Sequence, residues 1–248
     1  MSKIRVSGEF INLISAVFIA LILSFLIFKI QWWILVGLVI FQLIHILLQQ
    51  KQVQGSSLLV SEEQFPDINK IVNNAADKFN ISVPKTYVQY DPYINAYVMG
   101  FRNPYILVLT SSLVEAMSDE ELTFVVGHEM GHIRMGHARL KSFVFPLDRN
   151  IFLFTLLFNS WLRKTEYTAD RCGFYLSSNL KSSVNSLLKL AVGPKLYLKI
   201  NIREVIKQLV IADDERIEKI SEGLLDHPFI TNRIKKLAEF DKKSIDSI

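Results

Sequence analysis

One short stretch of the chain, Gly127 to His137, restricts the fold more than any other because it places three reactive side chains close together. It reads Gly-His-Glu-Met-Gly-His-Ile-Arg-Met-Gly-His. His128 and His132 are four residues apart, so on a helix their imidazoles lie on one face and can bind the same metal ion. Glu129 leaves the same turn close enough to reach a water molecule on that metal. The motif predicts a helix that carries part of a metal site, and such a site needs a third protein ligand.

The residues before this motif predict where the helix begins. Ser118-Asp119-Glu120-Glu121 has the spacing of a capping box, which satisfies free backbone N–H groups at a helix start. Apolar residues from Leu122 to Val126 then lead into the motif. We expect a partly buried helix, which gives a metal site rigid support.

A candidate third ligand lies downstream, where Glu166 and Asp170 are one helical turn apart. Because they share a helix face, Glu166 can bind the metal while Asp170 accepts a hydrogen bond from the far nitrogen of a ligating histidine. The small Ala169 between them allows close approach of another helix. The alternative is a solvated acidic pair beside Arg163 and Lys164. With the histidine motif in the same chain, we favour the ligand interpretation.

Two other histidines are weaker candidates. His137 lies nine residues after His128, which on a continuous helix is the opposite face, so we interpret it as a capping or packing residue. His45 lies near the end of an apolar run, where a packed or snorkelling histidine competes with a functional group inside a membrane. A metzincin-type third histidine is excluded because Ala138 stands at the required position.

The first fifty residues contain two uncharged apolar runs that match the thickness of a bilayer. Phe10–Phe28 and Ile30–Gln50 are separated by Lys29 alone, and each is about 30 Å long as a helix. A cleaved signal peptide would have a shorter apolar run and a cleavage site after it. We therefore expect a tight transmembrane hairpin. The predicted organisation is a hairpin at 1–51 with spans at about 10–28 and 31–49, a linker at 52–60, and a second domain at 61–248.

Charges beside the apolar runs predict the orientation of this hairpin. Lys3, Arg5 and Lys51 lie on one side and Lys29 on the other, so the positive-inside rule places both ends of the hairpin in the cytoplasm. The sequence thus predicts an integral, multi-pass protein of the plasma (inner) membrane whose second domain is cytoplasmic. The lone cysteine, Cys172, excludes an internal disulfide and fits a reducing compartment.

The balance of charge argues against one class of partner. The chain has 28 Lys and Arg residues against 24 Asp and Glu residues, and no basic stripe is interleaved with aromatic residues. We therefore expect no nucleic-acid partner.

The start of the second domain reads as a helix followed by strands. Residues 61–79 have apolar side chains at helical spacing, with Pro66 near the first turn. Three β-like runs separated by Asp-Pro and Asn-Pro turns follow, and they predict a small antiparallel sheet. These runs are Thr86–Tyr90, Ile94–Met99 and Tyr105–Thr110. The sheet is narrow, so the edge near Asn95 and Ala96 can accept an extended peptide as an added strand, although a purely structural meander gives the same pattern.

A strongly apolar stretch at about 143–162 lies between the two halves of the metal motif. His132 and Glu166 must be on the same side of a membrane, and only 33 residues separate them. Two crossings would need roughly 40 residues. We therefore expect a membrane-proximal helix that lies on the bilayer surface or packs on the anchor, with a plain core helix as the alternative.

Three motifs together resemble the HtpX-like membrane zinc peptidases, a family that includes the CAAX prenyl endopeptidases and a stress protease of the mitochondrial inner membrane. Asn95-Ala96-Tyr97 also looks like the edge-strand segment of that family. The resemblance covers about residues 60–240. The motifs are Gly127-His128-Glu129-x-x-His132-x-x-x-Gly136-His137, Glu166-Tyr167-x-Ala169-Asp170, and His227-Pro228-x-x-x-x-Arg233-Ile234. Family members often carry further spans between the zinc motifs, and this chain departs from them there.

The resemblance implies a mainly helical α+β fold with a gluzincin (zincin-like) domain, one Zn²⁺ per chain, and endopeptidase activity on membrane or misfolded proteins. It also implies that the segment from His227 to Arg233 lies over the active site. His227 would then stabilise the oxyanion or cap the zinc, and Arg233 would pair with Asp170 or a nearby carboxylate.

The sequence therefore predicts a membrane-anchored zinc metalloendopeptidase of protein quality control, with the lipid bilayer and a protein or peptide substrate as its partners. His128, His132 and Glu166 would hold the zinc, Glu129 would act as the base, and the edge near Asn95 would hold the substrate. One alternative is a membrane-bound regulator with a structural zinc site, which would not need Glu129. A second alternative is a zinc hydrolase of non-peptide substrates.

Overall fold

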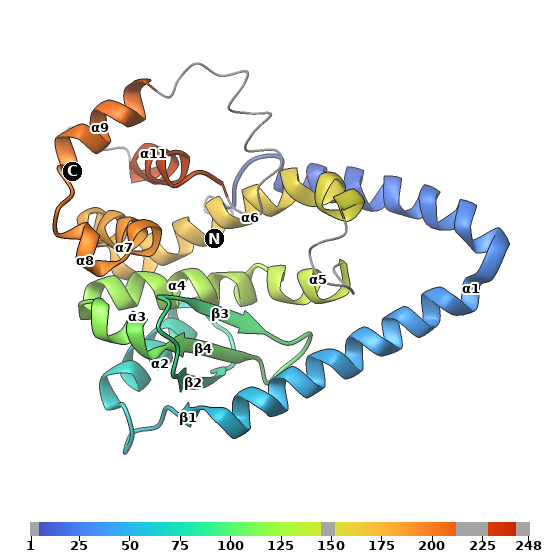
Figure 1. The fold of residues 1–248 in the computed structure, drawn as a ribbon, viewed down its shortest axis with the longest axis horizontal. Coiled ribbons are helices and arrows are strands. Elements are labelled where there is room, and N and C mark those ends of the chain that lie inside the picture. Colours follow the sequence, from blue (N-terminus) through green and yellow to red (C-terminus); the bar gives the residue numbers. More distant parts are fainter. Residues whose placement is uncertain (1–4, 145–151, 212–227, 242–248) are drawn as a thin grey trace.

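The computed structural model describes residues 5–144, 152–211 and 228–241. Most of them are helical and four short strands form one sheet (Figure 1), so the predicted mainly helical α+β class is confirmed. The elements are α1 (Glu9–Ser56), β1 (Leu58–Leu59), α2 (Pro66–Phe79), β2 (Lys85–Gln89), β3 (Ala96–Met99), β4 (Ile106–Thr110), α3 (Ser111–Ala116), α4 (Asp119–Arg134), α5 (His137–Val144), α6 (Phe152–Ser177), α7 (Leu180–Val192), α8 (Pro194–Tyr197), α9 (Ile202–Ile211) and α11 (Ile230–Asp241).

Both apolar runs of the first fifty residues lie in α1, which is one helix of 48 residues. Figure 1 shows two arms that meet at a bend far from the sheet. The first arm lies beside α6, where Ala16 packs against Phe158 and Trp161. The second arm returns to the sheet, where Val53 is buried against Tyr87 and its neighbours. The bent helix therefore brackets one side of the domain.

The apolar character of α1 is compatible with a bilayer. Among the described residues, Val36–Ser56 is long and apolar enough to cross a membrane, and Glu9–Phe25 is a shorter apolar helix. Large apolar side chains such as Phe18, Leu21 and Leu48 are exposed on both arms. The pair of spans and the division into an anchor and a second domain stay predictions.

The sheet has the order β1-β2-β4-β3 and is mixed, so the prediction of an antiparallel sheet is wrong in one pair. β1 and β3 are antiparallel to their neighbours, whereas β2 and β4 are parallel. The chain passes from β2 to the outer edge, forms β3 there, and returns between the two strands as β4. Alternation of apolar residues identifies strands but does not specify which strands are neighbours, and this is why the sequence did not predict the parallel pair.

The predicted linker at 52–60 is also wrong, because it contains the end of α1 and the strand β1. Val53 is 5% exposed on the sheet, and Leu58–Leu59 pairs with β2. Gln52 and Ser56 of this segment occupy exposed positions on α1 rather than in a loop. The next helix begins at Pro66 instead of residue 61, since a proline suits the first helical position and disfavours helical geometry in the residue before it.

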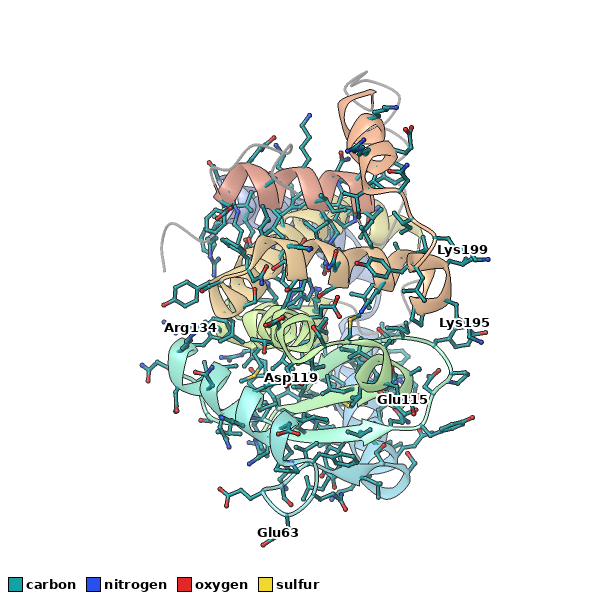
Figure 2. The ribbon with its side chains drawn as sticks, turned by 90° about the vertical axis from the view of Figure 1, so that its left-hand side faces the viewer. Glu63, Glu115, Asp119, Arg134, Lys195 and Lys199 are labelled. Atoms are coloured by element: carbon teal, nitrogen blue, oxygen red, sulfur yellow. The ribbon has the colours of Figure 1, made fainter. Side chains whose placement is uncertain are left out.

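The main core lies between the sheet and the helices α2, α4, α6, α7 and α11. Phe79 of α2, Leu107 of β4, Phe124 of α4 and Leu187 of α7 are among its fully buried side chains. Figure 2 shows that labelled charged residues of both signs surround this core and point outward. These exposed residues are Glu63, Glu115, Asp119, Arg134, Lys195 and Lys199.

The predicted apolar helix at about 143–162 is divided between two helices. α5 ends at Val144 and α6 begins at Phe152, and the residues between them lie outside the described part of the chain. α6 then continues without interruption through Glu166 and Asp170. Because the apolar stretch and the second ligand motif share one helix, the packing of Trp161 on α1 also fixes the axis that carries Glu166.

Candidate metal centre

Three glycines allow α4 and α6 to cross at very close range. A Cβ atom on Gly131 would lie 2.5 Å from the Cβ of Cys172, and one on Gly173 would lie 2.6 Å from the backbone oxygen of Phe124. A Cβ atom on Gly127 would meet Gly173 at 3.0 Å. Of the small residues at this crossing, only Ala169 was predicted from the sequence. The close contact brings the histidine motif of α4 against the acidic motif of α6.

His128, His132 and Glu166 converge at this crossing, and all three are buried. Their ligand atoms lie within 4.8 Å of one another. The Nε2 atom of His128 is 3.4 Å from Glu166 Oε2, and the Nε2 atom of His132 is 3.5 Å from Glu166 Oε1.

These separations fit a bound metal ion. Two atoms that each lie about 2.0–2.1 Å from a tetrahedral zinc ion are roughly 3.4 Å apart. Two imidazole nitrogens and one carboxylate oxygen also form the ligand set of several catalytic zinc sites, which keep a fourth position open. The cluster therefore has both the donor atoms and the spacing that a metal ion requires.

Glu129 lies beside the cluster, with Oε1 4.0 Å from His128 Nε2. Burial raises the pKa of Glu129 to about 7 in the metal-free chain. A carboxyl group with a pKa near neutrality can both accept and donate a proton. The structure thus brings Glu129 to the edge of the cluster, where proton transfer is needed.

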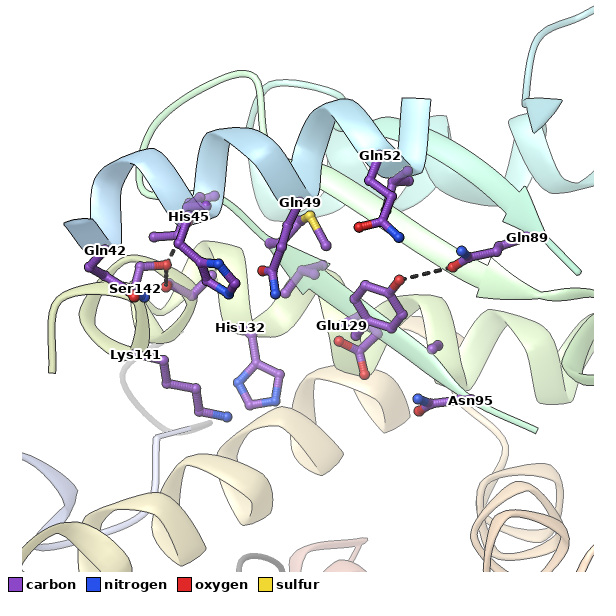
Figure 3. A pocket seen from close by; sticks show the side chains of 18 of the residues that line it. Gln42, His45, Gln49, Gln52, Gln89, Asn95, Glu129, His132, Lys141 and Ser142 are labelled. Carbon is purple, nitrogen blue, oxygen red and sulfur yellow. Dashed lines mark hydrogen bonds between the residues drawn. The ribbon is translucent and has the colours of Figure 1, made fainter. Parts of the chain in front are cut away.

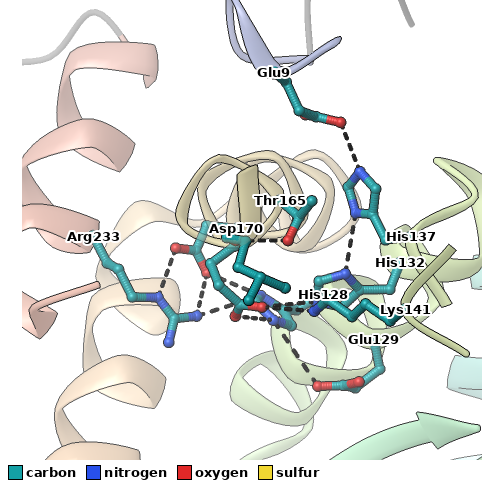
Figure 4. A network of polar contacts seen from close by, with 11 residues as sticks. Glu9, His128, Glu129, His132, His137, Lys141, Thr165, Asp170 and Arg233 are labelled. Carbon is teal, nitrogen blue, oxygen red and sulfur yellow. Dashed lines mark hydrogen bonds and ion pairs between the residues drawn. The ribbon is translucent and has the colours of Figure 1, made fainter. Parts of the chain in front are cut away.

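Behind His128, a charged pair fixes the orientation of the imidazole. Asp170 Oδ1 is 2.9 Å from His128 Nδ1, and Arg233 contacts both oxygens of Asp170, at 2.6 and 2.9 Å. Although burial raises the pKa of Asp170, Arg233 lowers it below its usual value. Burial lowers the pKa of His128, but hydrogen bonds to Asp170 and Glu166 outweigh burial and raise it to about 9. Arg233 also ties α11 to α6 at this point (Figure 4).

Behind His132, the support is a second histidine. The Nδ1 atoms of His132 and His137 are 3.1 Å apart, and His137 Nε2 is 2.8 Å from Glu9 Oε1 (Figure 4). The prediction that His137 lies on the opposite face is wrong, since α4 ends at Arg134. Gly136, with a φ of 78°, turns the chain and brings His137 back against His132.

Hydrogen-bond geometry determines the tautomers along this chain of groups. When His132 binds a metal through Nε2, its Nδ1 carries the proton and donates to Nδ1 of His137. The proton of His137 is then on Nε2 and is donated to Glu9. Burial lowers the pKa of both imidazoles, so both are neutral. Glu9 also accepts a hydrogen bond from Thr168.

The site opens into a groove of about 1050 Å³ between α1, β3, α4, α5 and α6. Asn95 and Ala96 line the same groove as Glu129 and the metal cluster (Figure 3). Lys141 of α5 also lines it, with Nζ 3.0 Å from Glu166 Oε1. Lys141 was not predicted from the sequence, because no local pattern indicates that a lysine will face a carboxylate 25 residues away.

Two further histidines were candidates from the sequence. His227 lies outside the described residues. His45 lines the groove and stacks on Phe41, with ring centroids 6.2 Å apart.

A mainly helical fold with a small sheet, and a buried cluster of two histidines and one glutamate on crossing helices, define a metallopeptidase of the gluzincin class. Residues 62–156 and 142–241 match peptidase family M48, so the chain belongs to that family. The predicted resemblance to the HtpX-like peptidases is thereby confirmed.

Similar proteins agree with this assignment. The Plastoglobule-localized metallopeptidase 48, chloroplastic, of Arabidopsis thaliana is 29% identical over 209 residues, which cover 76% of this chain and 60% of that protein. A Protease HtpX homolog of Streptococcus uberis is 26% identical over 223 residues, covering 72% and 74% of the two chains. The crystal structure of S. mikatae Ste24p has the same fold, with a TM-score of 0.54 at 18% identity, over 94% of this chain and 67% of that one.

Proposed function

We propose that this protein is a membrane-anchored zinc endopeptidase that cleaves peptide bonds in membrane or misfolded proteins. One observation carries the proposal: a buried cluster of two histidines and one glutamate opens into a groove that also contains Glu129 and the edge strand β3. A zinc site that served stability alone would need neither the groove nor Glu129. Membership of peptidase family M48 supports the same reaction.

Zinc is the proposed metal because its preferred ligands and geometry match the cluster. His128, His132 and Glu166 would hold one zinc ion per chain. When bound, the zinc would act as a Lewis acid on the scissile carbonyl group and lower the pKa of water at the open position.

Glu129 in the groove and side chains behind the ligating histidines perform the remaining steps. Glu129 accepts a proton from the attacking water and then delivers it to the leaving amine. Asp170 and His137 keep the two ligating imidazoles in the required orientation. His227, as the family resemblance implies, stabilises the oxyanion or caps the metal.

The edge strand β3 is proposed to hold the substrate in an extended conformation. The backbone oxygen of Asn95 accepts from the N–H of Thr110, so Asn95, Tyr97 and Met99 direct their backbone groups toward β4. Alternation along the strand leaves the N–H and C=O groups of Ala96 and Val98 on the opposite edge. A substrate strand can pair with those groups.

The membrane placement is part of the same proposal. Residues 1–51 would form a hairpin anchor, and residues 61–248 would form the peptidase domain on the cytoplasmic side of the plasma (inner) membrane. The apolar segment Val36–Ser56 and the excess of basic residues at the two ends of the hairpin support this arrangement.

The decisive test is Glu129→Gln in the full-length protein, purified in detergent and assayed with casein. The variant should keep one zinc ion per chain and lose activity by about 10²–10⁴-fold, since only proton transfer is removed. Glu120→Gln, at the exposed start of the same helix, is the matched control and should retain full activity. Full activity in Glu129→Gln would contradict the assigned role.

The two alternative functions predict different results for the wild-type protein. A regulator with a structural zinc site would contain zinc and cleave no polypeptide. A hydrolase of non-peptide substrates would cleave a small ester but leave casein and unfolded membrane proteins intact.

A further inference from the structure

The second arm of α1 carries a polar stripe that faces the metal site. Gln42, His45, Gln49 and Gln52 recur at intervals of three and four residues, so they share one helix face. All four line the groove, and Figure 3 shows them projecting from α1 toward Glu129 and His132. The stripe is therefore one wall of the groove, although it lies within the segment that is apolar enough to cross a membrane.

The remainder of this arm has the opposite character. Ile44, Leu47 and Leu48 are between 51% and 63% exposed and do not line the groove. A helix with one lipid-compatible face and one row of amides directs its polar groups toward a function, because amides are unfavourable in hydrocarbon without partners. This arrangement indicates that the polar face is used inside the groove.

The side chains of the stripe have no hydrogen-bond partners within the described part of the protein. Within the part of the chain that the structure describes, the side chains of Gln42, His45, Gln49 and Gln52 form no hydrogen bond with another residue; the hydroxyl of Ser56 donates to the backbone oxygen of Gln52 and not to its side chain. By contrast, Gln89 in the same groove accepts a hydrogen bond from Tyr97. The side chains of the stripe therefore have donors and acceptors available for a molecule in the groove.

The strand β3, which also lines the groove, indicates what kind of molecule would bind there. β3 offers the outward backbone groups of Ala96 and Val98, which can pair with only one edge of an added strand. The groups on the other edge of that strand would find no partner in the sheet, and the stripe lines the same groove. A glutamine side chain has both a donor and an acceptor, so it can pair with either backbone group, whatever the side chains of the substrate.

The dimensions agree with this geometry. Gln42 and Gln52 are ten residues apart, which is about 15 Å along a helix. An extended chain covers that length with four or five residues. The stripe is therefore long enough to accompany a substrate segment past the metal cluster.

We propose that the polar stripe of α1 binds the backbone of the substrate and selects segments that are extended rather than helical. The ligand class is an unwound apolar segment of a membrane protein at the bilayer. A helical segment has already paired its backbone groups internally and offers nothing to the stripe, whereas an unwound segment has both edges free. The inference rests on the proposed peptidase function.

The test compares Gln42→Leu/Gln49→Leu/Gln52→Leu with the wild-type protein in lipid nanodiscs. The substrate is a fluorogenic apolar peptide of about ten residues. Loss of backbone hydrogen bonds should raise KM about tenfold and change kcat less than about twofold. Gln50→Leu is the matched control, because Gln50 is on the same helix but does not line the groove, and it should behave as the wild type. Zinc content should be unchanged in both variants.

A set of peptides, each N-methylated at one backbone amide, separates a backbone contact from general damage. In the wild type, methylation on either edge of the substrate should weaken cleavage. In the triple variant, every second position should become tolerant, because only the edge that faces β3 still has partners. An unchanged KM, or the same pattern of sensitive positions in both proteins, would overturn the proposal.

Binding keeps this test independent of catalysis. In the Glu129→Gln background, the triple variant should bind the labelled peptide about tenfold more weakly than the parent. If the wild type cleaves no peptide but this difference in affinity is found, the proposed peptidase function is wrong and the proposed binding role of the stripe is supported. Equal affinities of the triple variant and its parent for the peptide would show that the stripe does not bind the substrate.

Discussion

The two histidines that face Glu166 are held from behind by different regions of the molecule. Behind His128, Asp170 and Arg233 form a charged pair between α6 and α11, inside the domain. This support could be inferred from sequence motifs that lie within the family match. It is therefore part of the architecture of the domain itself.

Behind His132, the support is neutral and extends to the other end of the chain. His137 connects His132 to Glu9, the first residue of α1, and Arg5 binds both Glu9 and the backbone oxygen of Met135. The start of the proposed anchor is thus in contact with the metal cluster. His128 is thus supported by α6 and α11, whereas the support of His132 also requires that the start of α1 packs against this part of the protein.

The largest effect is expected where the buried charged pair is broken. Asp170→Ala leaves the guanidinium of Arg233 buried without its carboxylate and should cost about 3–5 kcal/mol of stability. Loss of the hydrogen bond to His128 should also lower zinc affinity about 10–100-fold. Unfolding in detergent followed by tryptophan fluorescence, and zinc competition with a chelator, measure the two effects. Asp170→Ala/Arg233→Met should recover part of the stability, and a single variant as stable as the wild type would contradict this account.

A smaller effect is expected on the side of His132. His137→Ala removes the acceptor for the Nδ1 proton of His132 and should lower zinc affinity about tenfold. Glu9→Gln keeps an oxygen that accepts from His137 and should lower affinity only about two- to fivefold. Glu63→Gln, which changes an exposed carboxylate, is the control. If His137→Ala binds zinc as tightly as the wild type, the connection to the anchor does not support the site.

The smallest effect concerns protonation of the metal-free protein. The pKa of His128 is raised to about 9, so its contribution to stability is complete below about pH 6.5 and is lost as the pH rises through 9. The pKa of His132 is lowered by burial, so its contribution is complete above about pH 6.5 and falls at lower pH. Nitrogen-15 NMR of the imidazoles at pH 7.5 should therefore find His128 charged and His132 neutral. A neutral His128 and a charged His132 would contradict the roles assigned to Asp170 and His137.

The comparison also shows which features a sequence can reveal. The capping box at Ser118 is present, and the spacing of Glu166 and Asp170 does place both on one face of α6. These features depend on residues a few positions apart, so helical periodicity is sufficient to predict them. The stripe on α1 also has helical spacing, but it was not predicted, because the apolar run that contains most of it was identified only by its lack of charge.

Features that depend on distant contacts were not predictable in the same way. The contact of Glu9 with His137 joins residues 128 positions apart, and no local pattern specifies it. The position of His137 follows from the end of α4 at Arg134 and the turn at Gly136, whereas the sequence-based prediction had extended the helix through it. The parallel pairing of β2 and β4 likewise depends on the path between strands and not on the strands themselves.

X-ray absorption at the zinc edge of the full-length wild-type protein tests the central claim most directly. Two imidazole nitrogens and one carboxylate oxygen should surround one zinc ion per chain, with a fourth light ligand from solvent. Glu166→Ala should remove the carboxylate signal and lower the zinc content. Three imidazoles around the zinc, or an unchanged spectrum in Glu166→Ala, would contradict the assignment of His128, His132 and Glu166 as the metal site.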